Sequence, residues 1–256
     1  MISVVLATHN EEKNLARALD SIKQFANEIV IVDGNSTDNT VKIAQSYQAV
    51  VLQTTNKPIF HINKQLAIDQ AKNNLILQLD ADEAVDQELA KFIIDLDRNL
   101  MAKPSAVIDS AWWIRRKNNF LGHWLKKGGQ YPDPVIRLFI KNKAFLPQKS
   151  VHEQMTVKGS IGWATGHLCH YSNPTLADYW RKLQAYTALE ADKFSQTKLT
   201  VPLALYYLFI KPIITFLTLF FRHKGFIDGI YGFLFAFLSA LHFPIIIYKV
   251  IKQKFS

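Results

Sequence analysis

The first hundred residues alternate between short apolar runs and longer amphipathic segments. The segments at 15–22 and 61–73, and one from about Thr40, carry apolar residues at helical spacing and predict helices. The apolar runs are too short for helices and predict strands, at residues 2–7, 28–32, 50–53 and 75–79. Such an alternation of strand and helix is typical of a mainly parallel α/β sheet with helices on both faces. Asn10 is expected to cap the helix that contains residues 15–22.

The pattern changes after about residue 104. Strands are expected over 111–116 and 135–140, with a Gly-rich, aromatic loop at 122–134 between them. An amphipathic helix over 174–198 and an apolar helical tail follow, the tail broken at Pro202, Pro212 and Pro244. We therefore expect an α/β domain over residues 1–195 and a helical appendage over 196–256.

The apolar run at 75–79 ends abruptly in acidic residues, Asp80, Asp82 and Glu83. Ligands in open α/β sheets bind beyond the carboxyl ends of the strands. In an extended chain Asp80 and Asp82 lie on the same side, where a divalent cation would relieve their repulsion. The pattern predicts a site for a metal and a diphosphate. The alternative is an acidic loop that caps the next helix, because Glu83 and Asp86 also suit a helix start.

Composition excludes several classes of function. The single cysteine, Cys169, allows no internal disulfide and no zinc cluster, which fits a reducing, cytosolic setting. We expect Cys169 to be a small buried apolar residue. No cleavable signal segment is expected at the N-terminus, because the apolar run there reaches a polar segment by Thr8. A dinucleotide-binding or P-loop protein is not supported, because no glycine-rich loop follows the first strand.

The positive charge gathers in the tail. The chain has a formal net charge of +9, and residues 198–256 contain seven Lys or Arg, one Asp and ten of the 17 Phe. This mixture favours an anionic membrane surface as a partner rather than nucleic acid. Residues 199–221 and 229–248 are each about long enough to span a bilayer. The basic connector 222–228 and Lys211 instead favour helices that lie in the interface, at the cytoplasmic face of the inner membrane.

Three motifs resemble those of a known family. The residues from Val4 to Glu12, from Val32 to Thr40 and from Leu79 to Glu83 resemble the strand-end motifs of family 2 glycosyltransferases with the GT-A fold. Further along, Arg137-Leu138-Phe139, Val151-His152-Glu153, His170-Tyr171 and the basic aromatic tail resemble the WaaE/LgtF-like branch, which acts on lipopolysaccharide core. The resemblance implies an inverting enzyme that uses a nucleotide-diphosphate sugar and a divalent metal, Mg²⁺ or Mn²⁺.

The resemblance also implies roles for single residues. It assigns the catalytic base to Glu153, with His152 as the alternative base or an orienting neighbour. It assigns the metal to Asp82, with Asp80 facing ribose or a metal-bound water and His170 as a further ligand. Residues implied in binding the nucleotide are Thr8, Asn10, Glu11, Asp33, Asn35, Lys64, Asp80 and Arg137.

Several of these residues also have a plainer interpretation. Asp33 can simply start a turn with Gly34, and Glu153 can be a solvated surface acid. Arg137 can pair with Asp133, and Lys64 can be a solvated lysine on a helix. A single histidine such as His170 is more often structural than a ligand.

These observations favour transfer of a hexose from a nucleotide sugar, such as UDP-glucose, to a lipid-linked glycan such as lipopolysaccharide core. One alternative is transfer to a polyprenyl phosphate. Another is a catalytically silent, membrane-bound module that binds sugar nucleotides, against which the presence of Asp82 and Glu153 argues. A nucleotidyltransferase would need a Gly-rich basic loop after the first strand, and the residues from Thr8 to Glu12 form no such loop.

Overall fold

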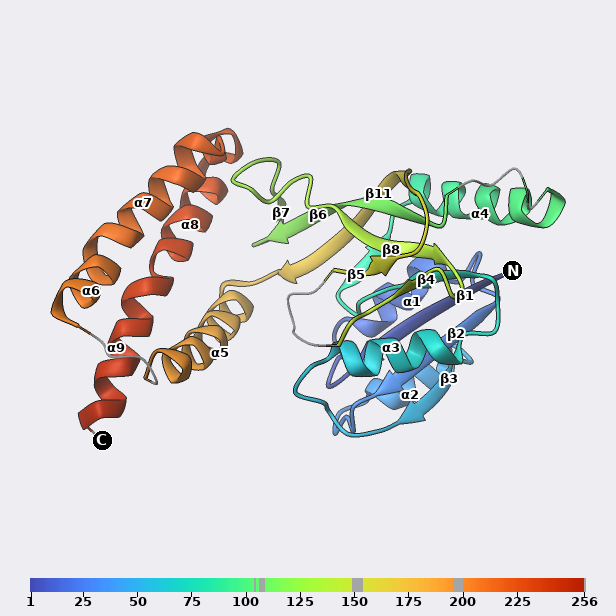
Figure 1. Cartoon of the computed structure of the whole chain (residues 1–256), viewed down its shortest axis with the longest axis horizontal. Coiled ribbons are helices and arrows are strands. Elements are labelled where there is room, and N and C mark those ends of the chain that lie inside the picture. The colour runs from blue at the N-terminus through green and yellow to red at the C-terminus, as the bar shows by residue number, and fades with distance from the viewer. Residues whose placement is uncertain (104, 106–108, 149–153, 196–199, 256) are drawn as a thin grey trace. The chain divides into compact units, whose positions relative to one another are not determined.

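The computed structural model describes residues 1–103, 105, 109–148, 154–195 and 200–255 (Figure 1). Strands and helices alternate in the predicted order in the first part of the chain. The helix predicted over 61–73 ends earlier, at Gln70, because Ala71 adopts an extended conformation. The elements are β1 (Ile2–Thr8), α1 (Leu15–Ile22), β2 (Glu28–Asp33), α2 (Thr40–Ser46), β3 (Val50–Gln53), α3 (His61–Gln70) and β4 (Leu75–Gln78).

Strands dominate the next part of the chain. The predicted strands at 111–116 and 135–140 are present, the first extending to residue 120, and a short strand interrupts the loop expected at 122–134. The elements are β5 (Glu83–Val85), α4 (Gln87–Ala102), β6 (Ala111–Phe120), β7 (His123–Trp124), β8 (Val135–Ile140), β9 (Ala144–Phe145), β10 (Thr156–Val157) and β11 (Ile161–Asn173).

The strands form a mixed sheet in the order β3-β2-β1-β4-β8-β6-β11-β5, with β7 paired to β6. The half from β3 to β4 is parallel. β8 runs antiparallel to β4 and β6, and β11 runs antiparallel to β5. β9 and β10 pair separately. This confirms the α/β class and the GT-A-like arrangement, with its antiparallel part confined to the strands after β4.

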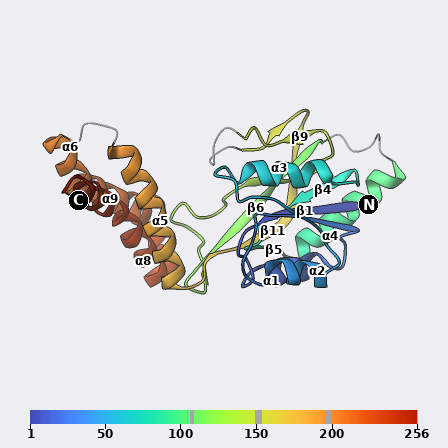
Figure 2. The ribbon, with the colours of Figure 1, turned by 90° about the horizontal axis from the view of Figure 1, so that it is seen from below.

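The parallel half of the sheet is buried on both faces. Figure 2 shows α3 on one face and α1 and α2 on the other. Alternate residues of a strand point to opposite faces, so Val4 and Leu6 pack with α1 and α4, while Val5 packs with α3. The strand ends are thereby fixed, and the turns that follow them carry the candidate site.

The chain divides into two compact units. The first contains residues 1–116 and 134–170, and the second contains 117–133 and 171–256. The functional boundary expected at residue 195 stays a prediction. The helices of the second unit are α5 (Leu176–Ser195), α6 (Val201–Leu205), η2 (Tyr206–Ile210), α7 (Lys211–Leu217), η3 (Thr218–Arg222), η4 (Gly225–Asp228), α8 (Gly229–Ala240) and α9 (His242–Phe255).

The prediction that prolines break the tail is wrong at Pro212, whereas helices begin next to Pro202 and Pro244. Pro202 lies in the first turn of α6, and Pro244 lies in the first turn of α9, where a missing N–H costs no helical hydrogen bond. Pro212 follows the π-helical turn η2, and the run from Val201 to Arg222 continues through it as one helix. A local π-helical adjustment accommodates a proline in this way.

Gly166 lets β11, which carries His170, approach the start of α4. Its φ is +77°, and a Cβ there would lie 2.2 Å from the backbone nitrogen of Leu89 and 2.6 Å from Oδ1 of Asp86. Asp86 caps α4, because its Oδ1 accepts the N–H groups of Leu89 at 2.9 Å and His167 at 3.0 Å. Only glycine fits this close approach.

We expect Gly166→Ala to lower the free energy of unfolding by roughly 2–4 kcal/mol, from overpacking and an unfavourable φ together. Urea denaturation of the full chain measures this. The matched control is Gly122→Ala, because Gly122 has a φ of +82° but nothing within 4 Å of its Cβ position. That variant should lose only about 1 kcal/mol. Equal losses in the two variants would contradict the steric explanation.

Candidate functional site

The turn after β2 is built on Asp33. Its carboxylate accepts hydrogen bonds from the Thr8 hydroxyl at 3.0 Å, the Ser36 backbone N–H at 2.8 Å and the Ser36 hydroxyl at 2.6 Å. The residue is fully buried. Asp33 therefore organises the turn and ties β1 to β2, as its plainer interpretation expects, and its contact with a nucleobase stays a prediction. Thr8 is brought directly against it.

Asn10 belongs to the same pair of turns. Its N–H donates to the Ser36 hydroxyl at 2.8 Å, and its side-chain oxygen accepts the Thr37 N–H at 2.8 Å. The expectation that Asn10 caps the first helix is wrong. The helix begins at Leu15 after Asn14, and Asn10 has a φ of +56°, a left-handed conformation that suits a turn. The Asn10 side chain therefore links the turn after β1 to the turn after β2 by a hydrogen bond.

Glu11 and Asn35 lie in these turns as well. The Glu11 N–H donates to the Thr40 hydroxyl at 2.7 Å, and its carboxylate accepts from the Asn14 side chain at 2.9 Å. Asn35 is exposed and has a φ of +64°. The ends of β1 and β2 thus form one polar edge of the sheet, with exposed groups available to a ligand.

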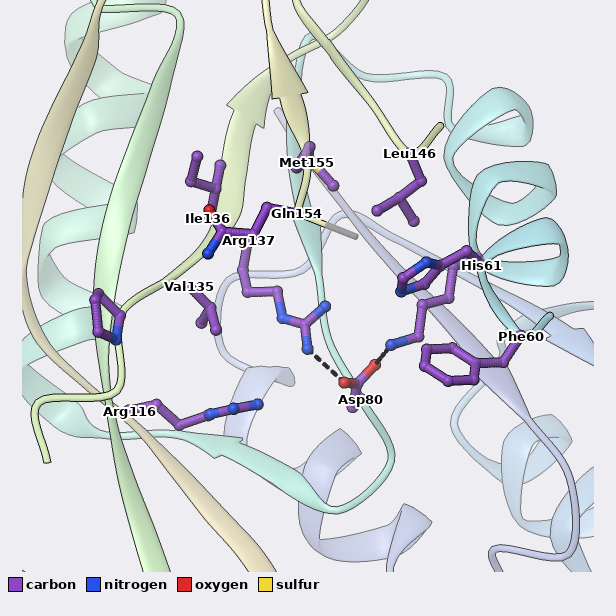
Figure 3. Close-up of a pocket in the computed structure, with 12 residues that line it drawn as sticks. Phe60, His61, Asp80, Arg116, Val135, Ile136, Arg137, Leu146, Gln154 and Met155 are labelled. Carbon is purple, nitrogen blue, oxygen red and sulfur yellow. Dashed lines mark hydrogen bonds and ion pairs between the residues drawn. The ribbon is translucent and has the colours of Figure 1, made fainter. Parts of the chain in front are cut away.

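Asp80 follows β4 and is held between two cations, as Figure 3 shows. Lys64 Nζ lies 2.5 Å from its Oδ1, and Arg137 forms an ion pair with its Oδ2. Gln78 donates to Oδ1 at 3.0 Å and accepts from Arg137. Burial alone would raise the pKa of Asp80, but Arg137 and Lys64 outweigh it and hold that pKa well below its usual range. Burial lowers the pKa of Lys64.

Glu83 and Arg116 complete this charged cluster. Sequence reasoning missed Arg116 and gave Glu83 only the role of an acid at a possible helix start. Glu83 is fully buried in β5, its Oε1 lies 3.2 Å from Arg116 and 3.4 Å from Arg137, and its Oε2 accepts the Asp80 N–H at 3.0 Å. Glu83 is therefore not part of a helix start. An arginine pair inside an apolar strand, Arg115-Arg116, was the available signal. Counted over Lys64, Arg116, Arg137, Asp80 and Glu83, the cluster contains three cations and two carboxylates, a formal excess of one positive charge.

Lys64, Asp80, Arg116 and Arg137 of this cluster line a pocket of about 330 Å³ in the first unit (Figure 3). Phe60, His61 and Lys64 reach it from α3 and the residue before it, while Arg116 and Arg137 reach it from β6 and β8. Among the described residues, the buried Nε of Arg137 has no hydrogen-bond acceptor. A pocket with a cationic excess and such a donor suits an anionic ligand such as a phosphate.

Asp82 and His170 meet at the same strand ends. His170 lies on β11 opposite Glu83 in the register of β5, and its Nε2 is 3.4 Å from Oδ2 of Asp82. Both side chains are partly exposed, 22% for Asp82 and 17% for His170. Sequence reasoning had placed these two residues in one site, and the structure brings them together.

The pair fits a divalent cation that also binds a substrate. Carboxylate oxygen suits Mg²⁺ and Mn²⁺, and imidazole is a common ligand for transition metals. Within the described residues no group of three His, Cys, Asp or Glu side chains is placed to hold a metal alone. Two protein ligands together with the phosphate oxygens of a substrate are a usual arrangement for Mg²⁺. Asp80 differs, because its oxygens already face two cations.

The expected base, Glu153, and its neighbour His152 lie outside the described residues. Met155, two residues later, lines the pocket with Gln154. Arg137 pairs with Asp80 and Glu83, rather than with Asp133, which was its plainer interpretation. The side chain of Asp133 instead accepts from Asn118 at 3.0 Å.

Comparison with known proteins places this chain among glycosyltransferases. Residues 3–152 match the model of the family described as Glycosyl transferase family 2. The chain is 30% identical over 260 residues to the lipopolysaccharide core biosynthesis glycosyltransferase LpsC of Rhizobium meliloti, covering 93% of this chain and 90% of that protein. It is also 45% identical over 51 residues to RT0209, an uncharacterized glycosyltransferase of Rickettsia typhi, covering 20% of this chain and 18% of that protein.

A solved structure shares the fold. The mannosyltransferase PcManGT of Pyrobaculum calidifontis, whose structure contains GDP-Man and Mn²⁺, superposes with a TM-score of 0.54. The match covers 99% of this chain and 87% of that one, at 13% identity. At this identity the likeness concerns the fold alone.

The pH dependence of stability should report the ion pairs of Asp80. The pKa of Asp80 is lower in the folded state than its unfolded value of about 3.9. Its stabilising contribution is therefore fully present above about pH 5 and is lost as the pH falls toward the folded pKa. We expect Asp80→Asn to lower the free energy of unfolding by roughly 3 kcal/mol at pH 7, with a smaller deficit below about pH 4.

Urea denaturation between pH 3 and pH 7 measures this difference. The matched control is Asp20→Asn, because Asp20 forms an exposed pair with Lys23 at 2.9 Å. Exposed pairs contribute little to stability, so this variant should follow the wild type at each pH. A deficit in Asp80→Asn that does not change with pH would contradict the ion-pair account.

Proposed function

We propose that this chain, which belongs to glycosyltransferase family 2, transfers a hexose from a nucleotide-diphosphate sugar to a lipid-linked glycan of the cell envelope. Its similarity to LpsC over 93% of the chain supports an acceptor of the lipopolysaccharide core type. UDP-glucose is the donor we expect. The observation that carries the proposal is the cationic cluster around Asp80 beside the Asp82–His170 pair.

The cluster supports binding of the donor diphosphate. Asp80 and Glu83 hold Lys64, Arg116 and Arg137 close together without neutralising all of their charge. A diphosphate would supply the missing negative charge and would restore the pKa of Lys64, which burial lowers. Arg137 presents a planar fork of donors that matches phosphate oxygens.

Asp82 and His170 would hold the divalent cation, Mg²⁺ or Mn²⁺. When bound, the cation neutralises charge on the diphosphate leaving group. Asp82 supplies the hard carboxylate oxygen, and His170 supplies a nitrogen from the neighbouring strand β11. Asp80 supports this site indirectly, because it positions two cations that face the same phosphates.

The proposed reaction inverts configuration by a single displacement at the anomeric carbon. It requires a base that takes the proton of the acceptor hydroxyl, and a carboxylate within hydrogen-bond reach suffices. We assign this role to Glu153, and His152 is the alternative. The assignment rests on the Val151-His152-Glu153 motif, and no covalent nucleophile is needed.

The tail supports a membrane-embedded acceptor. Two helices within the described residues, Val201–Arg222 and Gly225–Gln253, are long and apolar enough to cross a membrane by length and composition. The first is not buried within the protein. We place these helices at the cytoplasmic interface of the inner membrane, where they would bring the first unit to its acceptor.

The role of Asp82 in metal binding can be tested directly. We expect Asp82→Ala to abolish transfer and to remove the Mg²⁺ or Mn²⁺ dependence of donor binding, because the only carboxylate of the pair is lost. Titration calorimetry with UDP-glucose, with and without EDTA, measures the binding. Asp95→Ala on the exposed face of α4 is the control and should behave as the wild type. Near wild-type turnover in Asp82→Ala would refute the metal site.

The assignment of the base has its own test. Glu153→Gln keeps the size of the side chain but cannot accept the proton. We expect its turnover to fall by about 10²–10⁴, with donor affinity within a few-fold of wild type. Rates of nucleotide release at saturating donor measure this. An active Glu153→Gln together with an inactive His152→Ala would move the role to His152.

A further inference from the structure

A loop of the second unit, residues 117–133, is held to the turn between the two tail helices by Asp228. The Asp228 carboxylate accepts the backbone N–H of Lys126 at 2.9 Å and that of Lys127 at 2.9 Å, and it lies 3.2 Å from Nε2 of His123. It is 5% exposed and is the single acidic residue in the sequence after Lys198. A buried carboxylate with this many donors holds its partners firmly.

Further contacts fix the same two segments together. The Gly128 N–H donates to the carbonyl oxygen of His223 at 2.9 Å. The His123 ring stacks on Tyr231 of α8, with ring centroids 4.6 Å apart and an interplanar angle of 8°. Two segments about a hundred residues apart in the sequence, the loop 117–133 and the connector 222–228, are thus joined. We call this contact the joint, and the buried carboxylate of Asp228 accepts hydrogen bonds within it.

The joint gathers exposed positive charge. Lys126 and Lys127 from the loop come next to the basic connector, and all of these side chains are exposed. We call this set the basic turn: Lys126, Lys127, Arg222, His223 and Lys224. Because backbone N–H groups face Asp228, its carboxylate does not pair with the lysine side chains. The basic turn therefore keeps its charge for an external partner.

Large apolar side chains adjoin the basic turn in the sequence and are exposed. They are Phe221 at 56%, Phe226 at 50%, Ile227 at 51% and Ile230 at 62%. Cations beside exposed aromatic and aliphatic side chains match a membrane surface, where the apolar groups enter the acyl boundary and the cations meet headgroups. A soluble acidic protein would not require so many exposed apolar groups.

We propose that the basic turn binds anionic phospholipid headgroups, so that the helical hairpin lies along the membrane rather than across it. This inference rests on the proposed function, because that function supplies the reason for the protein to bind a membrane, namely a membrane-bound acceptor. It adds the loop lysines, which lie far from the tail in the sequence, to the membrane-binding surface.

The packing of α9 on α5 argues against a hairpin that spans the bilayer. Lys249 of α9 donates to the Gln184 carbonyl at 2.7 Å, and Gln253 donates to Asp192 at 2.7 Å. Nearer the start of α9, His242 lies 3.1 Å from Glu190. A spanning α9 would therefore carry the charged helix α5 into the hydrocarbon, which is strongly unfavourable.

The chain path agrees with this orientation. The loop leaves the first unit after Arg116 and returns to it at Pro134, and both of these residues line the pocket. From Lys126 to Pro134 the chain can extend at most about 28 Å, which is less than the full thickness of a bilayer, about 40–45 Å. The short connection is compatible with a basic turn that stays on the cytoplasmic side, as the proposed orientation requires.

Sedimentation with vesicles tests the headgroup contact. We expect the full chain to bind phosphatidylcholine vesicles containing phosphatidylglycerol far better than vesicles of phosphatidylcholine alone. Lys126→Gln combined with Lys127→Gln should weaken binding to the anionic vesicles by about twenty-fivefold, since each lysine near such a surface contributes about fivefold. Lys91→Gln with Lys103→Gln removes two exposed charges from the first unit and should change binding little.

Several results would overturn the inference. One is unchanged binding of the loop variant, another is an equal loss in the control, and a third is equal binding of the wild type to both kinds of vesicle. Donor binding measured in detergent separates this test from the proposed function. The loop variant should bind UDP-glucose as the wild type does. A wild type that binds vesicles but no nucleotide sugar would refute the function and leave the surface intact.

Cysteine labelling tests the orientation. Lys224→Cys in a Cys169→Ala background places one thiol in the basic turn. We expect no reaction with a membrane-impermeant maleimide added to intact cells, and complete reaction after the cells are lysed. Labelling from outside the intact cells would show a spanning hairpin and overturn the proposed orientation.

Discussion

The candidate site depends on a partly buried carboxylate, Asp80, that is held between Lys64 and Arg137. Each of these cations would be costly to bury alone, because burial disfavours the charged form. Asp80 and Glu83 together make it possible to keep Lys64, Arg116 and Arg137 in the lining of one pocket. They leave a positive excess that an anionic donor would neutralise. The ion pairs thus stabilise the fold, and in the proposed function they also prepare the pocket for a diphosphate.

The main fold could be predicted from the sequence because its strands are short apolar runs buried on both faces. The alternation from β1 to β4 was expected, and so was the placement of Asp33, Asp80 and Asp82 at strand ends. Those residues lie at or just beyond the ends of strongly apolar strands. The presence of His170 beside Asp82 followed from a motif resemblance, and the register of β11 against β5 gives its physical reason.

Other features could not be predicted because they depend on contacts between distant segments. Glu83 suggested a helix start by its charge and position, yet it forms a short strand against β11 and pairs with Arg116. Asn10 is a good capping residue in general, but the turn after β2 uses it instead. Pro212 does not break the tail, because a π-helical turn precedes it. The joint at Asp228 involves residues about a hundred positions apart, which no local pattern reveals.

We propose that this family 2 glycosyltransferase uses a nucleotide-diphosphate sugar and a divalent cation at the edge of the sheet that carries Asp80 and Asp82. The most direct measurement is nucleotide release from a panel of nucleotide sugars, with and without lipopolysaccharide-core acceptors. The account predicts release from one donor, preferably UDP-glucose, that requires both an acceptor and Mg²⁺ or Mn²⁺ and stops with EDTA. Release that is unaffected by EDTA, or no release from any donor in the panel with acceptors present, would contradict it.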